Sequence, residues 1–305
     1  MKVQFQDNRI PLFDLHCDTF SELYLQNLNI SSSPLHISLD KAKTFAPYVQ
    51  VASVWTDKRV ADNCGYYHFL KCADYFHNQL NTVCLQNTHF ILGVEDARIL
   101  ADDITRLQTL YNLGVRVLTL CWKGETCIGG GWDTLSPLTP FGVEVVLKCA
   151  DLGITVDLSH ASTNVQNQVF DLARLHRFTP IFSHSNSYSV CPHKRNISDN
   201  SFKEIALLGG VVGLSLCCEH LTNDGKASIS TIIKHINHFL SLGGADVICL
   251  GCDLDGIDSL PEGMSSIYDL SMLYNTCVNE FGKEITTKLF FHNAYKFFAN
   301  LLKEE

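Results

Sequence analysis

The sequence has no long apolar run and no cluster of basic residues. None of its 305 residues lie in a continuous apolar segment of the roughly 18 residues that a membrane span requires. Lysine and arginine number 23 against 32 acidic residues, which gives a net charge of −9. Because recognition of a phosphate backbone depends on concentrated positive charge, we expect no nucleic-acid partner and no membrane partner. A hydrophobic content of 46% is sufficient for a large folded core.

A secretory leader and a lipid-anchor signal are also missing. The start, MKVQFQDNRIPLFDLHCD, lacks the apolar stretch of about 7 to 15 residues that follows a basic leader. We therefore expect a cytoplasmic protein whose thirteen cysteines are reduced thiols. Cys249 and Cys252 form a CxxC sequence, but they lie in a predicted strand. Their side chains would point to opposite faces, which argues against a redox pair.

The first predicted strand is not followed by a glycine-rich phosphate turn, so a doubly wound open sheet is disfavoured. Short β-branched apolar runs instead recur about every 25 to 35 residues, and most are followed by an amphipathic stretch, as expected of βα units. The eight predicted strands are IPLFDLHCD, YVQVASVWTD, THFILGVED, GVRVLTLCW, GITVDLSHAS, TPIFSHSNS, GGVVGLSLC and ADVICLGCDLDG. This pattern predicts an α/β fold, a (β/α)8 TIM barrel that forms a single domain over residues 1–305.

Helices are predicted between the strands and after the last one. The crossover over residues 19–46 is the one that lacks a clear long helix. Glycines that precede several strands, such as Gly153 and Gly209, are expected to end the preceding helices. The predicted helices cover about residues 66–86, 101–113, 141–152, 163–176, 199–208 and 228–242, and further C-terminal helices cover about residues 266–303.

Ionisable residues occur where predicted strands end, which is where barrel enzymes carry their catalytic groups. Alternation places Asp14, His16 and Asp18 on one face at the end of the first strand. Four later strands end in Glu95, His160, His184 and Asp253. Buried imidazoles and carboxylates need partners, and a mixed nitrogen and oxygen set at one end of a barrel favours zinc.

Five motifs resemble, in order, those of the renal (membrane) dipeptidase family of zinc peptidases. They are FDLHCDT, ILGVEDA, VDLSHAS, IFSHSNSYSVCPHKRN and LGCDLDG, and the similarity extends from about residue 12 to FFHNAYKFF near the C-terminus. The resemblance implies a barrel of the metal-dependent hydrolase, amidohydrolase-like type. It also implies two zinc ions per chain and a small dipeptide as substrate. Without an anchor signal, the chain resembles a soluble member of microbial type.

The resemblance also assigns the metal ligands. It makes His16 and Asp18 ligands of one zinc ion and His160 and His184 ligands of the other, with Glu95 as the carboxylate that bridges them. A hydroxide bridging the two ions would be the nucleophile, because bound cations lower the pKa of water towards neutrality.

Three further residues have a place in the implied reaction. Arg195 matches the arginine that binds the substrate's C-terminal carboxylate, a role suited to a guanidinium group. Asp253 matches the catalytic acid/base. Trp122 stands where renal members have a histidine that contacts the substrate, so we expect Trp122 to line the substrate site. The run Cys217-Cys218-Glu219-His220 also departs from the aromatic and asparagine residues of renal members.

The predicted function is therefore that of a zinc-dependent dipeptidase, which can also form a homodimer. Two alternatives stay open. The first is a binuclear metal amidohydrolase that acts on a non-peptide amide, and Trp122 is the residue that favours it. The second is a non-catalytic, metal-stabilised binding protein, against which the complete ligand set together with Asp253 argues.

Overall fold

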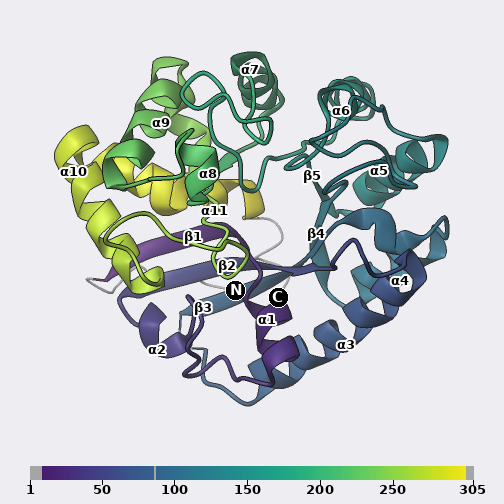
Figure 1. Cartoon of the computed structure of the whole chain (residues 1–305), viewed down its shortest axis with the longest axis horizontal. Coiled ribbons are helices and arrows are strands. Elements are labelled where there is room, and N and C mark those ends of the chain that lie inside the picture. Colours follow the sequence, from purple (N-terminus) through teal and green to yellow (C-terminus); the bar gives the residue numbers. More distant parts are fainter. Residues whose placement is uncertain (1–8, 86, 300–305) are drawn as a thin grey trace.

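Seven strands form one parallel sheet in the computed structural model, which describes residues 9–85 and 87–299. The order across the sheet is β5-β4-β3-β2-β1-β7-β6, and Figure 1 labels the first five strands of the chain. The strands are β1 (Ile10–Cys17), β2 (Phe45–Trp55), β3 (Thr88–Glu95), β4 (Val115–Thr119), β5 (Thr155–Asp157), β6 (Val212–Leu214) and β7 (Ile248–Leu250). The parallel pairing confirms the predicted α/β class, and the sheet has the form of a half-barrel.

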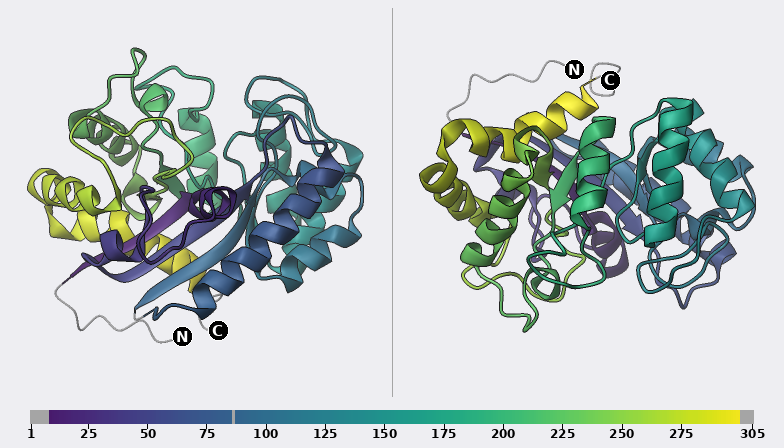
Figure 2. Two further views of the ribbon diagram at one scale, coloured as in Figure 1. Left: turned by 60° about the horizontal axis from the view of Figure 1, so that its bottom comes forward. Right: turned by 90° about the horizontal axis from the view of Figure 1, so that it is seen from above.

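Helices connect the strands and surround the sheet (Figures 1 and 2). They are α1 (Thr19–Gln26), α2 (Leu39–Ala42), α3 (Asp62–Asn81), α4 (Thr105–Asn112), α5 (Pro140–Leu152), α6 (Thr163–His176), α7 (Asp199–Leu208), α8 (Cys218–Leu221), α9 (Ile229–Ser241), α10 (Leu270–Thr287) and α11 (Asn293–Phe298). Only the short α1 and α2 occupy the first crossover, as predicted. Gly153 and Gly209 end α5 and α7 in the left-handed conformation that favours glycine. No helix of the described chain is both long and apolar enough to cross a bilayer.

The segment predicted as the sixth strand, residues 179–187, does not form a regular strand. Ile181 pairs with Asp157 at the end of β5, whereas Phe182 pairs with Val212 of β6. Backbone hydrogen bonds of 2.8 to 3.0 Å support both bridges. Because the segment changes its neighbour from one residue to the next, each pairing is too short to count as a strand. The polar run that follows then turns away to enter the site described below.

Apolar side chains from most strands meet in what we call the inner cluster. Phe13 packs against the ring of Phe298 at a centroid distance of 5.5 Å, so the C-terminal helices cover this cluster. The cluster comprises Phe13, Leu15, Val49, Val51, Ile91, Val117, Ile181, Val211, Cys249, Phe291, Ala294 and Phe298. Cys249 lies here, whereas Cys252 belongs to a separate and larger cluster. The two thiols therefore point to opposite faces and are not paired, as predicted.

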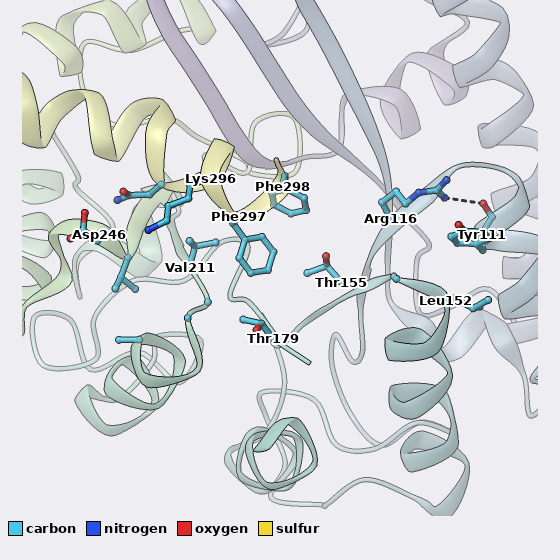
Figure 3. A pocket seen from close by; sticks show the side chains of 16 residues that line it. Tyr111, Arg116, Leu152, Thr155, Thr179, Val211, Asp246, Lys296, Phe297 and Phe298 are labelled. Carbon is cyan, nitrogen blue, oxygen red and sulfur yellow. Dashed lines mark hydrogen bonds between the residues drawn. The ribbon is translucent and has the colours of Figure 1, made fainter. Parts of the chain in front are cut away.

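A cavity of about 810 Å³ lies at the amino ends of β4, β5 and β6 (Figure 3). Its lining includes Arg116, Thr155, Thr179, Lys296 and Phe297. The predicted site lies at the opposite, carboxyl ends of the strands.

Candidate metal centre

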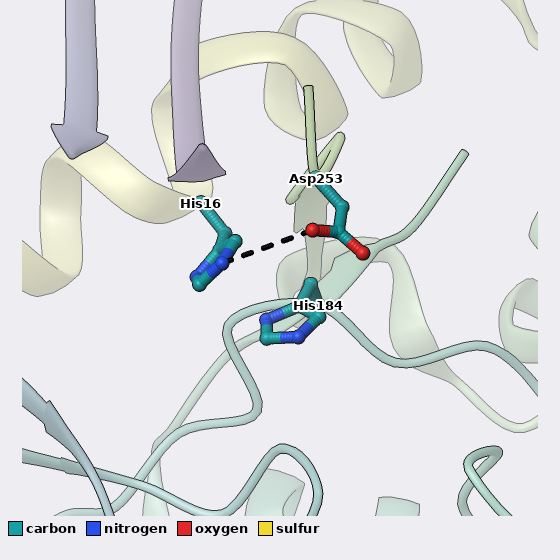
Figure 4. A group of neighbouring side chains, drawn as sticks. All are labelled: His16, His184 and Asp253. Carbon is teal, nitrogen blue, oxygen red and sulfur yellow. Dashed lines mark ion pairs between the residues drawn. The ribbon is translucent and has the colours of Figure 1, made fainter. Parts of the chain in front are cut away.

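Five ionisable side chains from separate segments meet at the carboxyl ends of the strands. Glu95 is the last residue of β3 and His16 lies near the end of β1. His160 follows β5, His184 follows the bridged segment at residues 181–182, and Asp253 follows β7. All are buried, with at most 9% of the residue surface exposed. Figure 4 shows three of them, His16, His184 and Asp253, converging from different parts of the chain.

Glu95 lies between two pairs of side chains. Its Oε2 is 3.2 Å from Nε2 of His16, and its Oε1 is 2.7 Å from Nε2 of His160 and 3.6 Å from Nε2 of His184. The two imidazole Nε2 atoms of His160 and His184 are themselves 2.8 Å apart. The two carboxylate oxygens therefore face different imidazoles, as a bridging ligand between two ions would require.

Two aspartates complete the cluster. Asp18 Oδ2 lies 3.5 Å from Nε2 of His16. Asp253 Oδ1 lies 3.8 Å from the same nitrogen (Figure 4). The described residues thus form three overlapping groups whose possible ligand atoms lie within 4.8 Å of one another. These groups are His16, Asp18 and Glu95; Glu95, His160 and His184; and His16, His184 and Asp253.

The donor atoms fit metal ions. Asp18 Oδ1 is buried and has no hydrogen-bond partner, and His16 Nε2 faces three carboxylates without forming a well-directed hydrogen bond to any of them. Leaving such atoms unpaired in a protein interior is costly, and a cation would satisfy both. Imidazole nitrogens together with carboxylate oxygens form the kind of set that zinc prefers.

Asp14 does not join these ligands, contrary to the alternation expected from the sequence. A register shift between Asp14 and Cys17 breaks the period of two in β1. Asp14 Oδ1 instead accepts hydrogen bonds from the backbone N–H groups of Cys252, at 2.8 Å, and His16, at 3.3 Å. Burial raises the pKa of Asp14 to about 6. Its contacts join the ends of β1 and β7, and both strands carry residues of the cluster.

The pKa values of the cluster reflect burial and mutual charge. Burial, together with the Arg195 guanidinium, lowers the pKa of His160 to about 4. Burial also disfavours protonation of His16, but Glu95 and Asp18 outweigh it and raise its pKa well above the usual range. Burial raises the pKa of Asp253 to about 8. A cation binding here would therefore compete with protons.

A hydrogen-bonded chain behind His184 sets the orientation of its ring. The Ser183 hydroxyl donates to Asp157 Oδ2 at 2.6 Å and lies 2.7 Å from Nδ1 of His184. Since a hydroxyl has a single proton, Nδ1 of His184 is the donor in the second contact, and Nε2 keeps its lone pair for the site. Sequence analysis missed Ser183 and Asp157, although each lies within a motif that carries a ligand.

The cluster opens into a chamber of about 620 Å³. All three tryptophans of the chain, Trp55, Trp122 and Trp132, line it. The ring of Trp122 lies 6.0 Å from that of His160 and 5.3 Å from that of Trp55. Trp122 therefore stands beside a candidate metal ligand, at a position where it can contact a substrate.

Arg195 also lines the chamber and is 4% exposed. Its Nη2 donates to the carbonyl of His184 at 3.3 Å, and its Nε is buried without a partner. Burial lowers the pKa of Arg195, but the ordinary value of a guanidinium is so high that the group stays charged. Arg195 makes no ion pair with any residue of the described chain, so the buried cation is available to an anionic ligand.

Comparisons with known proteins find one matching family model and several related sequences. A family model described as membrane dipeptidase (Peptidase family M19) matches residues 2–301. Dipeptidase 3 of Mus musculus is 31% identical over 203 residues, which cover 64% of this chain and 39% of that protein. An uncharacterized dipeptidase of Schizosaccharomyces pombe is 30% identical over 185 residues, which cover 58% and 44%. The chain thus matches less than half of the length of these two relatives.

Solved structures share the fold. A metallo peptidase from Rhodobacter sphaeroides, liganded with a phosphinate mimic of the dipeptide L-Ala-D-Ala, superimposes with a TM-score of 0.86 at 22% identity. The superposition covers 95% of this chain and 98% of that one. The probable dipeptidase PvdM from Pseudomonas aeruginosa gives a TM-score of 0.83 at 16% identity and covers 97% and 96%.

Proposed function

The chain belongs to the membrane dipeptidase family, and from this premise we propose that it is a zinc-dependent dipeptidase that hydrolyses small dipeptides. The observation that carries the proposal is the position of Glu95. Its two carboxylate oxygens face different histidines in a buried cluster that contains unpaired ligand atoms. Such an arrangement suits two ions held side by side.

In this proposal, His16 and Asp18 would hold one zinc ion, His160 and His184 would hold the other, and Glu95 would be shared by both. When bound, the ions would supply a hydroxide at neutral pH and polarise the scissile carbonyl. The Ser183 hydroxyl keeps Nε2 of His184 deprotonated and turned towards the site.

The remaining residues act on the substrate. Arg195 binds the C-terminal carboxylate through its unpaired guanidinium donors, and this fixes the position of the peptide bond. Trp122 packs against the substrate beside His160. Asp253 accepts the proton that a water gives up when it forms the hydroxide nucleophile, and passes that proton to the leaving amine. The position of Asp253 within reach of His16 supports this role.

We also propose that residues 181–182 supply the eighth strand that closes a (β/α)8 barrel, and that residues 1–305 form one domain. The bridges from Ile181 to β5 and from Phe182 to β6 support closure, as does the inner cluster, to which most strands contribute. The cytoplasmic location and the homodimer stay predictions from the sequence.

Amine release from a panel of L,L and L,D dipeptides tests the proposal. The zinc-loaded protein should hydrolyse members of the panel, and the Asp253→Ala variant prepared in parallel should not. Two metal ions per chain without hydrolysis of any dipeptide would contradict it. Because Trp122 lines the chamber, the panel should include non-peptide amides, whose selective turnover would favour that alternative. Inactivity towards every amide would favour the metal-stabilised binding protein.

A further inference from the structure

His220, in α8, presents an unpaired imidazole to the chamber. The residue lines the cavity, is half-buried, and stacks on the ring of His193 at a centroid distance of 4.8 Å and an interplanar angle of 35°. His193 in turn lies 5.8 Å from the ring of Trp132. Neither ring nitrogen of His220 hydrogen-bonds to another residue in the described ranges. The imidazole is therefore held by stacking, while its polar atoms are available to a ligand.

Side-chain contacts join the loop that carries Arg195 to the loop that carries His220. The Asn196 side-chain amide donates to the carbonyls of His220 and Cys191, each at 2.8 Å. The backbone N–H of Arg195 donates to Nδ1 of His193 at 3.2 Å. The Asn196 amide thus links the backbones of the two segments, and the His193 ring that contacts His220 is itself hydrogen-bonded to the backbone of Arg195. The guanidinium and the His220 imidazole consequently reach the same chamber from two different connections of the sheet.

The charge of this region suits a monoanion. Arg195 is buried and has no ion-pair partner in the described chain. Burial and the nearby Arg195 lower the pKa of His220 to about 2, and the same two causes lower the pKa of His193. His220 is therefore neutral at physiological pH and offers an N–H donor without adding a second positive charge. One cation with a neutral donor matches a carboxylate better than it matches a doubly charged phosphate.

We propose that His220 is a second substrate-binding residue, which donates a hydrogen bond to the same substrate carboxylate that Arg195 binds. This inference rests on the proposed dipeptidase function. The family resemblance assigns no role to His220, and the residue lies in a run that departs from renal members. The chain thus recognises the free C-terminal carboxylate of its substrate through two groups, the Arg195 guanidinium and the His220 imidazole.

Two matched substitutions separate hydrogen bonding from stacking. His220→Phe keeps a flat ring above His193 but removes the donor, whereas His220→Gln restores an N–H donor. For a dipeptide with a free carboxylate, His220→Phe should lower kcat/KM by about tenfold to a hundredfold, mainly through KM, as expected for a lost hydrogen bond to a charged group. Turnover of the C-terminally amidated dipeptide should not change, and His220→Gln should recover part of the loss. An equal loss on both substrates, or no loss, would overturn the proposal.

A binding measurement makes the result independent of turnover. The tryptophans that line the chamber allow a phosphinate dipeptide mimic to be titrated by fluorescence, with its carboxylate either free or amidated. His220→Phe should weaken binding of the free-acid mimic by a similar factor and leave binding of the amidated mimic unchanged. The exposed His176 provides a matched control, because His176→Phe makes the same substitution outside the chamber.

The outcomes distinguish the role of His220 from the dipeptidase function of the chain. If the zinc-loaded wild type hydrolyses dipeptides but His220→Phe behaves like the wild type, the role of His220 is refuted and the dipeptidase function stands. If the wild type hydrolyses no dipeptide, the proposed function fails, and the titration still decides the role of His220. Selective weakening of the free acid then supports that role, and unchanged binding refutes it.

Discussion

The two cavities at opposite ends of the sheet differ in chemistry, and the candidate site is not at the larger one. The cavity at the amino ends of the strands is the larger, about 810 Å³ against about 620 Å³. Two of its charged groups have partners, since Arg116 lies over the ring of Tyr111 at 4.3 Å (Figure 3), and Asp246 pairs with Lys288 at 3.0 Å. The chamber at the carboxyl ends contains buried ionisable groups with unpaired atoms. Unsatisfied buried polar atoms, rather than volume, therefore distinguish the candidate metal centre.

The difference has a structural cause. In parallel α/β folds the connections that follow the strands carry the variable side chains, whereas the amino ends serve stability. Here the C-terminal helices pack against the inner cluster, with Phe298 stacked on Phe13. At the other end, residues that follow the strands project ligands inward. Removing polar groups at the carboxyl ends of the strands should thus affect metal binding and activity, whereas removing them at the amino ends should not.

The largest effect is expected at Glu95. Glu95→Ala removes the side chain that faces both pairs of candidate ligands, so metal content should fall and activity should decrease by more than the roughly 10⁴-fold upper range for loss of an acid/base. Metal analysis and dipeptide hydrolysis check this. Thr179→Val removes a hydroxyl at the other cavity, where it donates to the carbonyl of Leu208, and should leave both quantities unchanged. A Glu95 variant with full metal content and full activity would contradict the expectation that only the chamber at the carboxyl ends of the strands supports metal binding and activity.

A smaller effect is expected at Asp253, and it would separate the roles within the chamber. Asp253→Asn keeps the size of the side chain but removes the proton acceptor. Turnover should fall by about 10²- to 10⁴-fold while metal content stays constant. Asp253 also belongs to a group with His16 and His184 that is able to hold a cation. Loss of metal in this variant would make Asp253 a ligand rather than the acid/base, so metal stoichiometry must be measured beside turnover.

Ser183→Ala tests whether the hydrogen bonds that orient His184 contribute to metal affinity. The substitution removes the hydroxyl between Asp157 and His184, so the imidazole loses its fixed tautomer. Metal affinity should fall by about 10- to 100-fold, the usual scale for such supporting groups. Competition with a chelator measures it. Thr155→Val is the matched loss of a hydroxyl at the other cavity and should leave the affinity as it is.

Sequence analysis predicted seven strands that the structure contains, the parallel class and the residues whose side chains converge at the strand ends, because these depend on apolar periodicity and on motifs at strand ends. It did not predict that Ile181 and Phe182 would each pair with a different neighbour, since that depends on tertiary register. Asp14 was misplaced for the same reason, because a register shift changes the face of a strand without leaving a signal in the alternation. His220 was visible only as a departure from the family, because stacking on His193 is a tertiary contact.

The smallest predicted effect concerns stability and extends the comparison to pH. His235, in α9, is fully buried and connects the two loops of the chamber. Its Nδ1 accepts a hydrogen bond from the N–H of Ser187 at 3.1 Å, so its Nε2 carries the proton and donates to the carbonyl of Leu221 at 3.1 Å. Burial lowers the pKa of His235 to about 4. The folded protein therefore holds this imidazole neutral.

The sign of the pH dependence follows from this. The folded pKa lies below the ordinary value of about 6.5, so the contribution of His235 to stability is complete above pH 6.5 and is lost as the pH falls towards 4. Between pH 7 and pH 5 the loss should be about 2 kcal/mol in the free energy of unfolding. Urea unfolding at both values should show that His235→Gln is less stable than the wild type at pH 7 but loses less on acidification. His77→Gln, at an exposed imidazole that contacts the carbonyl of Leu113, should keep the wild-type pH dependence. If His235→Gln also keeps it, protonation of His235 does not contribute to acid destabilisation of the chamber end.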